Sequence, residues 1–433
     1  MHDTGELIRK LEEPDDRIRA RARRRKIIII SLIVLVVLGI IFLVLNNIMG
    51  LIFRPIASLN SVPGDGEWAM FGCNPVHAGS IEPLIDHPLE KVTVVLSTGG
   101  AINSSPVVAD GTVYIGSRDH NLYAIDIETG DIRWKFKTGS WVESSPAVVD
   151  NTVYFGSNDG YFYAVDAATG QKKWNFHTKF VIRSSPAVAG GKVYFGSGDH
   201  HIHCLDVENG KEIWSVNTGS DIQSSPVVMN GILYTGTAGD YFFAVDANSG
   251  KVRNKFNVYK SVVSSPAVKD GTVYFATTDG RLYAFEGSSS NWLFEEKIRE
   301  IWKVFYFYGD ASKPPAASGF LWTLNLEAPT YSSPAIVHDI LYIGAGEKLV
   351  AVDLRSRQKL WEADAGGARY STPLVTDGRA YMAGEDGHLY VFDAHTGEQL
   401  QDLDVGGEIK TAPAIYGPSV YIGCGDGNLY RVD

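Results

Sequence analysis

The 433-residue sequence predicts an all-β fold, an eight-bladed β-propeller of four-stranded antiparallel blades, preceded by one N-terminal transmembrane α-helix. Three observations predict it. A Ser-Ser-Pro tripeptide or a near variant recurs about every 40 residues, a tryptophan often lies at a fixed offset before it, and one long apolar run lies near the N-terminus. Internal periods of about 40 residues, each read as four short strands, are typical of propeller blades.

The first element is the apolar run, residues 27–53, in which no side chain is charged. It is long enough to cross the hydrocarbon layer, which takes about 20 helical residues. Residues 1–26 hold nine Lys and Arg against six Asp and Glu, so the positive-inside rule leaves this basic tail in the cytoplasm. No small-residue cleavage site of a signal peptide is evident. We therefore predict a single-pass signal-anchor in the cell membrane, with the propeller outside the cytoplasm, periplasmic or extracellular.

Residues 54–90 are predicted to be a linker and pre-propeller segment, and they contain Cys73, one of only three cysteines. Three cysteines are an odd number and too few for a disulfide framework. Cys204 stands where other repeats have alanine, which indicates a small buried residue. Cys73 and Cys424 meet only if the N-terminal segment closes the ring beside the last repeat, and the sequence leaves that disulfide open.

The propeller itself is predicted over residues 91–433. Successive prolines of the repeated tripeptide are 40 residues apart except for one gap of 68 and one of 39, and they lie at Pro106, Pro146, Pro186, Pro226, Pro266, Pro334, Pro373 and Pro413. Each unit reads as four strands separated by tight turns such as Asp110-Gly111 and Thr129-Gly130. Glycine suits these turns because it adopts positive φ at little cost.

Closure of the ring is predicted from the tryptophan register. Trp134 lies ten residues before Ser144, and the same offset holds for Trp174, Trp214, Trp322 and Trp361. The last unit ends after its third strand, and Val94 lies ten residues before Ser104. We therefore expect residues 91–97 to supply the fourth strand of the last blade.

The long gap places an insert at about 287–319, between the third and fourth strands of the fifth blade. Residues 291–308 lack Pro and Gly and have apolar side chains three and four apart, which predicts a helix with Asn291 as its N-cap. We expect the insert and the N-terminal strand to share one face of the ring. The helix can settle in the membrane interface, dock on a membrane partner or pack on its own propeller. The residues predicted to bind a partner are Trp292, Phe294, Ile298, Trp302, Phe305 and Tyr306.

A second candidate surface lies at the channel mouth, on the face opposite the insert. The residue just before each tripeptide, and the residue two positions earlier, vary in chemistry, as expected for positions that the ring does not require. They suit a small polar ligand, a quinone, a partner loop or a water-filled channel, and the candidates are Glu143, Arg183, Asp221, Gln223, Tyr331, Tyr370, Glu408 and Lys410. The run His200-His201-x-His203 suggests a metal, but His200 would face away from the other two in a strand. We predict no metal site and no catalytic set.

The recurrent Asp-x-x-Thr-Gly-x-x-x-Trp, as in residues 126–134 and 166–174, resembles the repeat of the pyrroloquinoline-quinone-like (PQQ-like) β-propellers. Residues 68–79, Trp-Ala-Met-Phe-Gly-Cys-Asn-Pro-Val-His-Ala-Gly, are similar to the segment that commonly precedes the first blade in this superfamily. The resemblance covers about residues 68–433. It implies either quinoprotein dehydrogenases or cofactor-free scaffolds such as the B-subunit lipoprotein of the β-barrel assembly machine. This chain has neither a lipidated cysteine nor the adjacent Cys-Cys pair of quinoprotein alcohol dehydrogenases.

The predicted function is therefore a membrane-anchored, extracytoplasmic scaffold or accessory subunit that binds membrane or extracytoplasmic protein partners, without a cofactor. The formal charge of −11 argues against a nucleic-acid surface, which needs a basic stripe. The alternative is a quinone-dependent oxidoreductase that holds PQQ with Ca²⁺ at the channel mouth. Calcium needs several oxygen ligands at one spot, and the sequence offers no clustered acidic set there.

Overall fold

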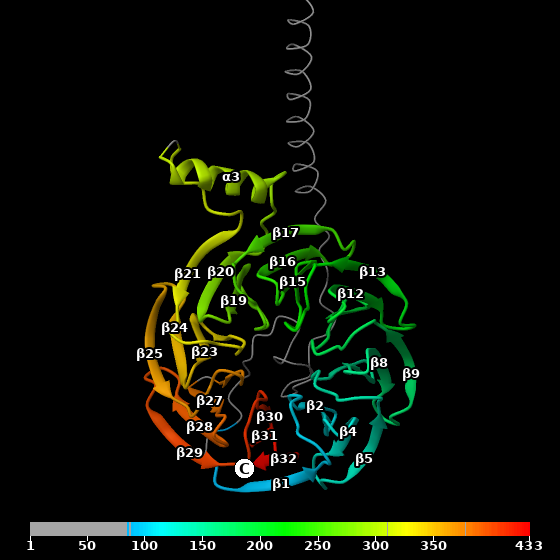
Figure 1. Ribbon diagram of the computed structural model, residues 1–433. Coiled ribbons are helices and arrows are strands. Elements are labelled where there is room, and N and C mark those ends of the chain that lie inside the picture. The colour runs from blue at the N-terminus through cyan, green and yellow to red at the C-terminus, as the bar shows by residue number, and fades with distance from the viewer. Residues whose placement is uncertain (1–84, 86–87, 310, 377) are drawn as a thin grey trace, which may run out of the picture. The chain divides into compact units, whose positions relative to one another are not determined.

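The computed structural model describes residues 85, 88–309, 311–376 and 378–433. These residues form eight four-stranded antiparallel sheets that follow one another around a ring (Figure 1). The predicted eight-bladed propeller is confirmed. The predicted transmembrane segment, residues 27–53, lies outside the described residues, and among those that are described no helix is long and apolar enough to cross a membrane.

Each blade runs from a short strand at the centre to a longer one at the rim. The innermost strands are β2 (Val107–Ala109), β6 (Ala147–Val149), β10 (Ala187–Ala189), β14 (Val227–Met229), β18 (Ala267–Lys269), β22 (Ala335–Val337), β26 (Leu374–Val375) and β30 (Ala414–Tyr416). The second strands are β3 (Thr112–Gly116), β7 (Thr152–Gly156), β11 (Lys192–Gly196), β15 (Ile232–Gly236), β19 (Thr272–Thr277), β23 (Ile340–Ala345), β27 (Arg379–Ala383) and β31 (Ser419–Gly423).

The third and fourth strands form the outer half of each blade. The third strands are β4 (Asn121–Asp126), β8 (Tyr161–Asp166), β12 (His201–Asp206), β16 (Tyr241–Asp246), β20 (Arg281–Glu286), β24 (Lys348–Asp353), β28 (His388–Asp393) and β32 (Asn428–Val432). The outermost strands are β5 (Ile132–Lys137), β9 (Lys172–His177), β13 (Glu212–Asn217), β17 (Val252–Asn257), β21 (Phe320–Asn325), β25 (Gln358–Asp364), β29 (Gln399–Asp404) and, from the N-terminal side, β1 (Val92–Ser97).

The ring closes as the tryptophan register predicts. Strand β1 pairs antiparallel with β32, with Val94 opposite Tyr430, and so becomes the fourth strand of the eighth blade. The backbone amides of Glu90 and Lys91 both donate to the carbonyl oxygen of Asp433, at 2.6 and 3.0 Å. Residues from the two ends of the propeller therefore hold one sheet together.

The repeated serine links neighbouring blades around the centre. The Oγ atom of Ser145 accepts a hydrogen bond from the backbone amide of Ser105 at 2.9 Å, and Ser185 receives one from Ser145 in the same way. The same bond continues through Ser225, Ser265 and Ser333. These serines are buried. Because a buried amide without a partner is costly, the repeated hydroxyl stabilises these blades by accepting a hydrogen bond from a buried amide of the blade before it.

The repeated tryptophan and glycine form a second link, near the rim. The indole of Trp174 donates to the carbonyl of Val207 in the next blade at 2.9 Å. Gly210, with φ of +69°, lies on the same indole, and a Cβ atom there would lie 2.5 Å from a ring carbon. Trp134, Trp214 and Trp361 meet Gly170, Gly250 and Gly397 in the same way. The glycine of this turn therefore recurs because no larger residue fits against the tryptophan of the neighbouring blade.

The insert contains the predicted helix, α3 (Glu295–Phe307). The predicted N-cap, Asn291, is wrong, because the capping residue is Phe294 in a left-handed conformation. The Asn291 side chain is used elsewhere, since its Oδ1 atom accepts a hydrogen bond from the backbone amide of Lys255 at 2.6 Å. The insert is thus bound to a neighbouring strand before the helix begins.

Two cysteines lie within the described residues, and both are free and buried. Cys204 is a core residue at the alanine position of its blade, as predicted, and burial raises the pKa of its thiol to about 12. The Sγ atom of Cys424 lies 2.9 Å from the carbonyl oxygen of Gly407. Cys73 lies outside the described residues.

Candidate functional site

The insert lies along the outer wall of the propeller, and not on the face from which it starts. It leaves β20 of the fifth blade beside the Asp270-Gly271 turn, where the amide of Gly287 donates to Gly271. The amide of Asn291 then donates to Arg253 in β17 of the fourth blade, and the helix reaches Tyr259 beyond the other end of that strand. Figure 1 shows α3 outside the ring, next to β17 and β21.

This position corrects the expectation that the insert and the N-terminal strand share one face. The insert does start from the face on which β1 begins, but α3 runs along the edge of β17 toward the opposite face. The edge of a β-sheet offers unpaired amides and carbonyls that favour pairing with further chain. Asn291 uses two of these groups, the carbonyl of Arg253 and the amide of Lys255, which explains the location of the insert.

The two ends of the insert, around Ser289 and Ser318, meet where other blades have a tryptophan, and we call them the neck of the insert. Asn254 stands in β17 at the position that Trp174 and Trp214 occupy in the preceding blades, and its side chain is buried. Its amide nitrogen donates to Ser289 Oγ at 3.2 Å and to the carbonyl of Ser318 at 3.0 Å, so it holds both ends of the insert. The link between the fourth and fifth blades is therefore polar at this point.

The polar side of α3 faces the propeller. Glu296 accepts a hydrogen bond from the hydroxyl of Tyr241 at 2.8 Å, and Glu300 accepts one from Tyr259 at 2.9 Å. Lys303 donates to Tyr259 and forms an ion pair of 2.6 Å with Glu300. Residues 296, 300 and 303 share one side of a helix because they are three and four apart. These contacts fix the rotation of the helix on the wall.

Glu295 is the buried residue of the helix, with 3% of its surface exposed. One carboxylate oxygen accepts from the amide of Ser318 at 2.7 Å, and the other accepts from Asn291 Nδ2 at 3.0 Å. Burial alone would raise the pKa of Glu295, but these hydrogen bonds outweigh it and the pKa lies below its usual value. The carboxylate therefore joins the two ends of the insert in its charged form.

A cleft of about 610 Å³ lies between α3, strand β17 and the returning segment 313–317. Its floor is aromatic, with Phe256, Tyr283 and Phe320, and its rim carries the charged side chains of the helix. Arg299 crosses the rim to donate to the carbonyl of Pro315 at 3.2 Å. The charged groups along this rim are largely paired with the insert itself or with the wall.

The apolar side of α3 faces solvent. Ile298 and Phe305 are exposed, as is Phe294 before the helix, so three predicted partner-binding residues lie on one open surface. Trp302 differs, because it is half-buried and its indole donates to the carbonyl of Ser312 at 2.9 Å. The prediction omitted Ile301, Val304, Phe307 and Tyr308, all of them exposed, although the spacing of three and four that identified the helix also includes Ile301 and Tyr308.

Six of the eight channel-mouth candidates form two separate groups. Glu143 is nearly buried and forms ion pairs with Arg118 at 2.6 Å and Arg183 at 3.1 Å. Burial alone would raise the pKa of Glu143, but the hydrogen bonds from Asn158 and Arg118 outweigh burial, and the pKa lies below its usual value. Across the ring, Tyr331 stacks on Tyr370 with ring centres 4.9 Å apart.

The second group also includes two charged candidates. Lys410 forms an ion pair with Glu408 at 2.8 Å and lies 5.5 Å from the centre of the Tyr370 ring. Asp221 instead contacts His200 at 3.3 Å, and Gln223 is exposed. The candidates therefore do not converge on one ligand.

A Ca²⁺-bound quinone does not fit these residues. Both carboxylate oxygens of Glu143 are occupied, one by Arg118 and the other by Arg183 and Asn158. Within the described ranges, no three His, Cys, Asp or Glu side chains are grouped so as to hold a metal ion. Calcium requires six to eight oxygen ligands, and the arginines that could bind quinone carboxylates are already paired.

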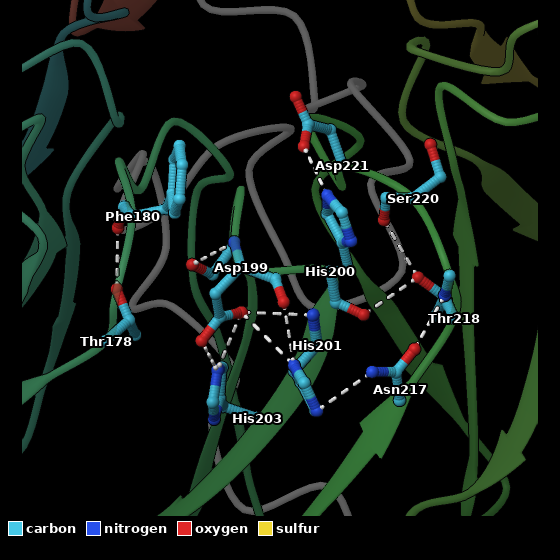
Figure 2. A network of polar contacts seen from close by, with 12 residues as sticks. Thr178, Phe180, Asp199, His200, His201, His203, Asn217, Thr218, Ser220 and Asp221 are labelled. Atoms are coloured by element: carbon cyan, nitrogen blue, oxygen red, sulfur yellow. Dashed lines mark hydrogen bonds and ion pairs between the residues drawn. The ribbon is translucent and has the colours of Figure 1, made fainter.

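The three neighbouring histidines do not converge on one point: His201 and His203 both contact Asp199, whereas His200 turns toward Asp221 (Figure 2). His200 contacts Asp221, the Nε2 atom of His201 lies 3.3 Å from Asn217, and His203 lies between Asp199 at 3.2 Å and Glu212 at 2.8 Å. Other blades have a tyrosine in place of His203, and its hydroxyl donates to the matching aspartate in the pairs Tyr123–Asp119, Tyr163–Asp159, Tyr390–Asp386 and Tyr430–Asp426. His203 thus belongs to the frame of its blade.

Two family models match consecutive parts of the chain. Residues 98–308 match the β-propeller of the beta-alanine-activating enzyme, and residues 315–433 match the outer membrane protein assembly factor BamB. No curated protein matches the chain.

Solved structures match most of the propeller at low sequence identity. BamB from Moraxella catarrhalis is 16% identical, with 80% of this chain and 100% of that chain covered and a TM-score of 0.65. A europium-containing methanol dehydrogenase is 15% identical, with 84% and 91% covered and a TM-score of 0.67. The computationally designed Ika8 protein is 17% identical, with 78% and 98% covered and a TM-score of 0.63. Together with the match to the BamB family model, these structures support the PQQ-like β-propeller superfamily. The solved structures include an assembly factor, an enzyme and a designed protein, so they show the fold alone.

Proposed function

We propose that this PQQ-like β-propeller is a membrane-anchored, extracytoplasmic scaffold that binds a partner protein through its insert. The anchor is the apolar run at residues 27–53, and the basic tail before it supports a cytoplasmic N-terminus. The partner is a membrane or extracytoplasmic subunit. The proposal assigns no cofactor and no catalytic residue.

The observation that carries the proposal is the orientation of α3. A helix at a protein surface ordinarily turns its apolar side to the core and its polar side to water. Here Glu295 is buried and Glu296, Glu300 and Lys303 contact the wall, while Ile298, Ile301 and Phe305 are exposed. Large exposed apolar patches on a protein mark interaction sites, since water contact costs about 25 cal/mol per Å² of apolar area.

The exposed surface is also rigidly held. The neck is bound by Asn254, the beginning of the insert by the edge of β17, and the helix by Tyr241 and Tyr259. A binding surface that is already ordered loses less conformational entropy when a partner docks. The insert therefore suits a stable subunit contact.

Co-purification tests this proposal. The tagged full-length chain, solubilised from its own membranes in mild detergent, should bring down a partner subunit in fixed ratio. A variant in which residues 288–318 are replaced by a Thr-Gly turn should fold and lose that subunit. Leu360→Glu, which changes an exposed apolar residue on β25, is the control and should keep it.

Two outcomes contradict the proposal. If the wild-type chain comes down alone, it is not a scaffold of a stable complex. If the partner stays bound after the insert is removed, the interface lies elsewhere on the propeller. Titration of the purified chain with PQQ and Ca²⁺ tests the oxidoreductase alternative, and a bound chromophore in a 1:1 ratio would replace the scaffold proposal.

A further inference from the structure

The exposed side of α3 carries a regular stripe. Ile298, Ile301 and Phe305 follow one another at intervals of three and four residues within the helix, and the cap residues Phe294 and Tyr308 continue the spacing at its two ends; between 39% and 73% of each residue is exposed. Alternation of four and three is the spacing at which one helix packs against another in a coiled coil. We call these five residues the seam.

The seam cannot turn toward its own propeller. Glu296, Glu300 and Lys303 lie on the opposite side of the helix and are bound to Tyr241 and Tyr259. Rotating the helix to bury the seam would break these contacts and would move the buried Glu295 carboxylate away from Ser318 and Asn291. The helix, about 20 Å long at 1.5 Å per residue, therefore presents the seam outward along its whole length.

We propose that the partner of this insert contributes an amphipathic α-helix that packs along the seam, with an acidic side chain opposite Lys297. This inference rests on the proposed function and specifies the partner. Lys297 is the charged residue of the outward side, and it makes no ion pair with any residue in the described part of the chain. Charged residues that flank a helical seam select partners of opposite charge.

A second copy of the chain fits less well than a different helix. The outward side of α3 offers Lys297 but no carboxylate, because Glu296 and Glu300 lie on the other side of the helix, where they accept hydrogen bonds from Tyr241 and Tyr259. Two copies would therefore bring a lysine to a surface that has no counter-charge. An acidic helix from another protein satisfies both the apolar stripe and the lysine.

A lipid surface also fits less well. Helices that lie in the membrane interface keep basic residues on the polar side to meet lipid headgroups. Here Lys303 and Arg299, on the polar side of α3, are bound to the wall and to the returning segment.

Site-specific photo-cross-linking in native membranes tests the inference. A photoreactive amino acid is placed in the full-length chain at position 298, 301 or 305, one at a time, and the cross-linked partner residues are mapped by mass spectrometry. If a helix lies on the seam, the three positions should label one segment of one protein, at residues three or four apart and in a single order. Position 360 on β25 is the control and should label nothing in that segment.

The mapping separates the possible failures. Labels that fall on a loop or on an extended segment of a partner would overturn the helical inference and leave the proposed function in place. Labels found on a second copy of this chain or on lipid would overturn both. Capture of a protein without the regular spacing counts against the inference.

A charge swap provides the second test. Ile301→Glu should weaken the complex roughly thirtyfold or more, because it puts a charge in the middle of the seam. Lys297→Glu should weaken it about fivefold, and changing the mapped acidic residue of the partner to lysine should restore it. The acidic contact is refuted if Lys297→Glu leaves the affinity unchanged or if the partner's lysine fails to restore it.

Discussion

The interface between the third and fourth blades differs from that between the fourth and fifth. At the first, the Trp214 indole donates to Ala247 at 3.1 Å and carries Gly250 on its ring. At the second, Asn254 replaces the tryptophan and binds Ser289 and Ser318. The missing tryptophan and the extra residues of the fifth blade are thus one structural change, since the neck of the insert occupies the place of the stacked turn.

The comparison shows how a repeat protein can accommodate an insert between two of its blades. In the regular interfaces, aromatic side chains are buried between blades, as where Phe162 stacks on Phe195 at 4.1 Å. In the insert, the polar side chains make the attachment and the aromatic ones other than Trp302 face solvent. A polar attachment at the wall leaves the whole apolar seam free for another molecule.

The largest expected effect comes from breaking the ring itself. A chain that begins at residue 99 lacks β1, so the eighth blade loses its outermost strand and β32 keeps only β31 as a partner. We expect the loss of most of the stability of the propeller, which for a folded domain is about 5–15 kcal/mol. Circular dichroism and urea unfolding of the truncated chain measure this. Unchanged cooperative unfolding would mean that β1 does not close the ring.

A smaller loss should follow when a regular interface is overfilled. Gly210→Ala places a Cβ atom 2.5 Å from the Trp174 ring at a φ of +69°, and we expect it to destabilise the chain by about 2–4 kcal/mol. Gly190→Ala is the matched control, because φ there is +58° but no atom lies within 4 Å of the new Cβ. It should cost only about 1–2 kcal/mol. Equal losses in urea unfolding would show that stacking against tryptophan does not explain the glycine.

Loosening the insert should have a local effect. Glu295→Ala removes the acceptor of the Ser318 amide, and an unsatisfied buried amide costs about 1–3 kcal/mol. Hydrogen exchange in residues 291–318 should accelerate, while the melting temperature of the propeller stays within a few degrees of wild type. A propeller that melts together with the insert would contradict the view that the insert is an addition to a complete ring.

Acidification should loosen the insert in the same way. The pKa of Glu295 lies below its value in an unfolded chain, so its stabilising contribution is complete above about pH 4.3 and is lost as the pH falls through the folded pKa. Faster exchange of residues 291–318 should therefore appear only in acid. Glu295→Gln should lack this pH response, and a response that persists in that variant would assign it to another carboxyl group.

The smallest expected effect is that of a charge on the seam. Ile301→Glu should change the stability of the isolated chain by no more than about 0.5 kcal/mol, because 57% of Ile301 is exposed. Phe162→Ala, in the core between two blades, should cost about 3–5 kcal/mol. A large loss of stability in Ile301→Glu would mean that the seam packs against its own chain.

The fold could be predicted because each repeat can be compared with the other repeats of the same chain, position by position. The prolines, turns and tryptophans fixed the eight blades, and the offset of Val94 from Ser104 located the closing strand. The site was harder to predict, since the residues of the insert have no equivalent positions in the other repeats. The bond of Asn291 to β17 depends on an edge that belongs to another blade, and so the sequence led to a wrong N-cap.

The pairing of side chains at the channel mouth was also beyond the sequence. Glu143, Arg118 and Arg183 come from loops 25 and 40 residues apart, and only the ring geometry brings them into ion pairs. The substitution of Asn254 for tryptophan is visible in the sequence beside a long insert in the next repeat. Such a coincidence can be used to find insert necks in other repeat proteins.

The most direct measurement is the accessibility of the seam in the native membrane. Ile301→Cys and, as control, Leu360→Cys in the full-length chain are labelled with a water-soluble maleimide, with the wild type as background. We predict that Cys at 301 reacts rapidly in the purified chain and slowly in intact membranes, whereas Cys at 360 reacts equally in both. Equal and rapid labelling of position 301 in both settings would contradict the account, because an interface that holds a partner cannot stay open to solvent.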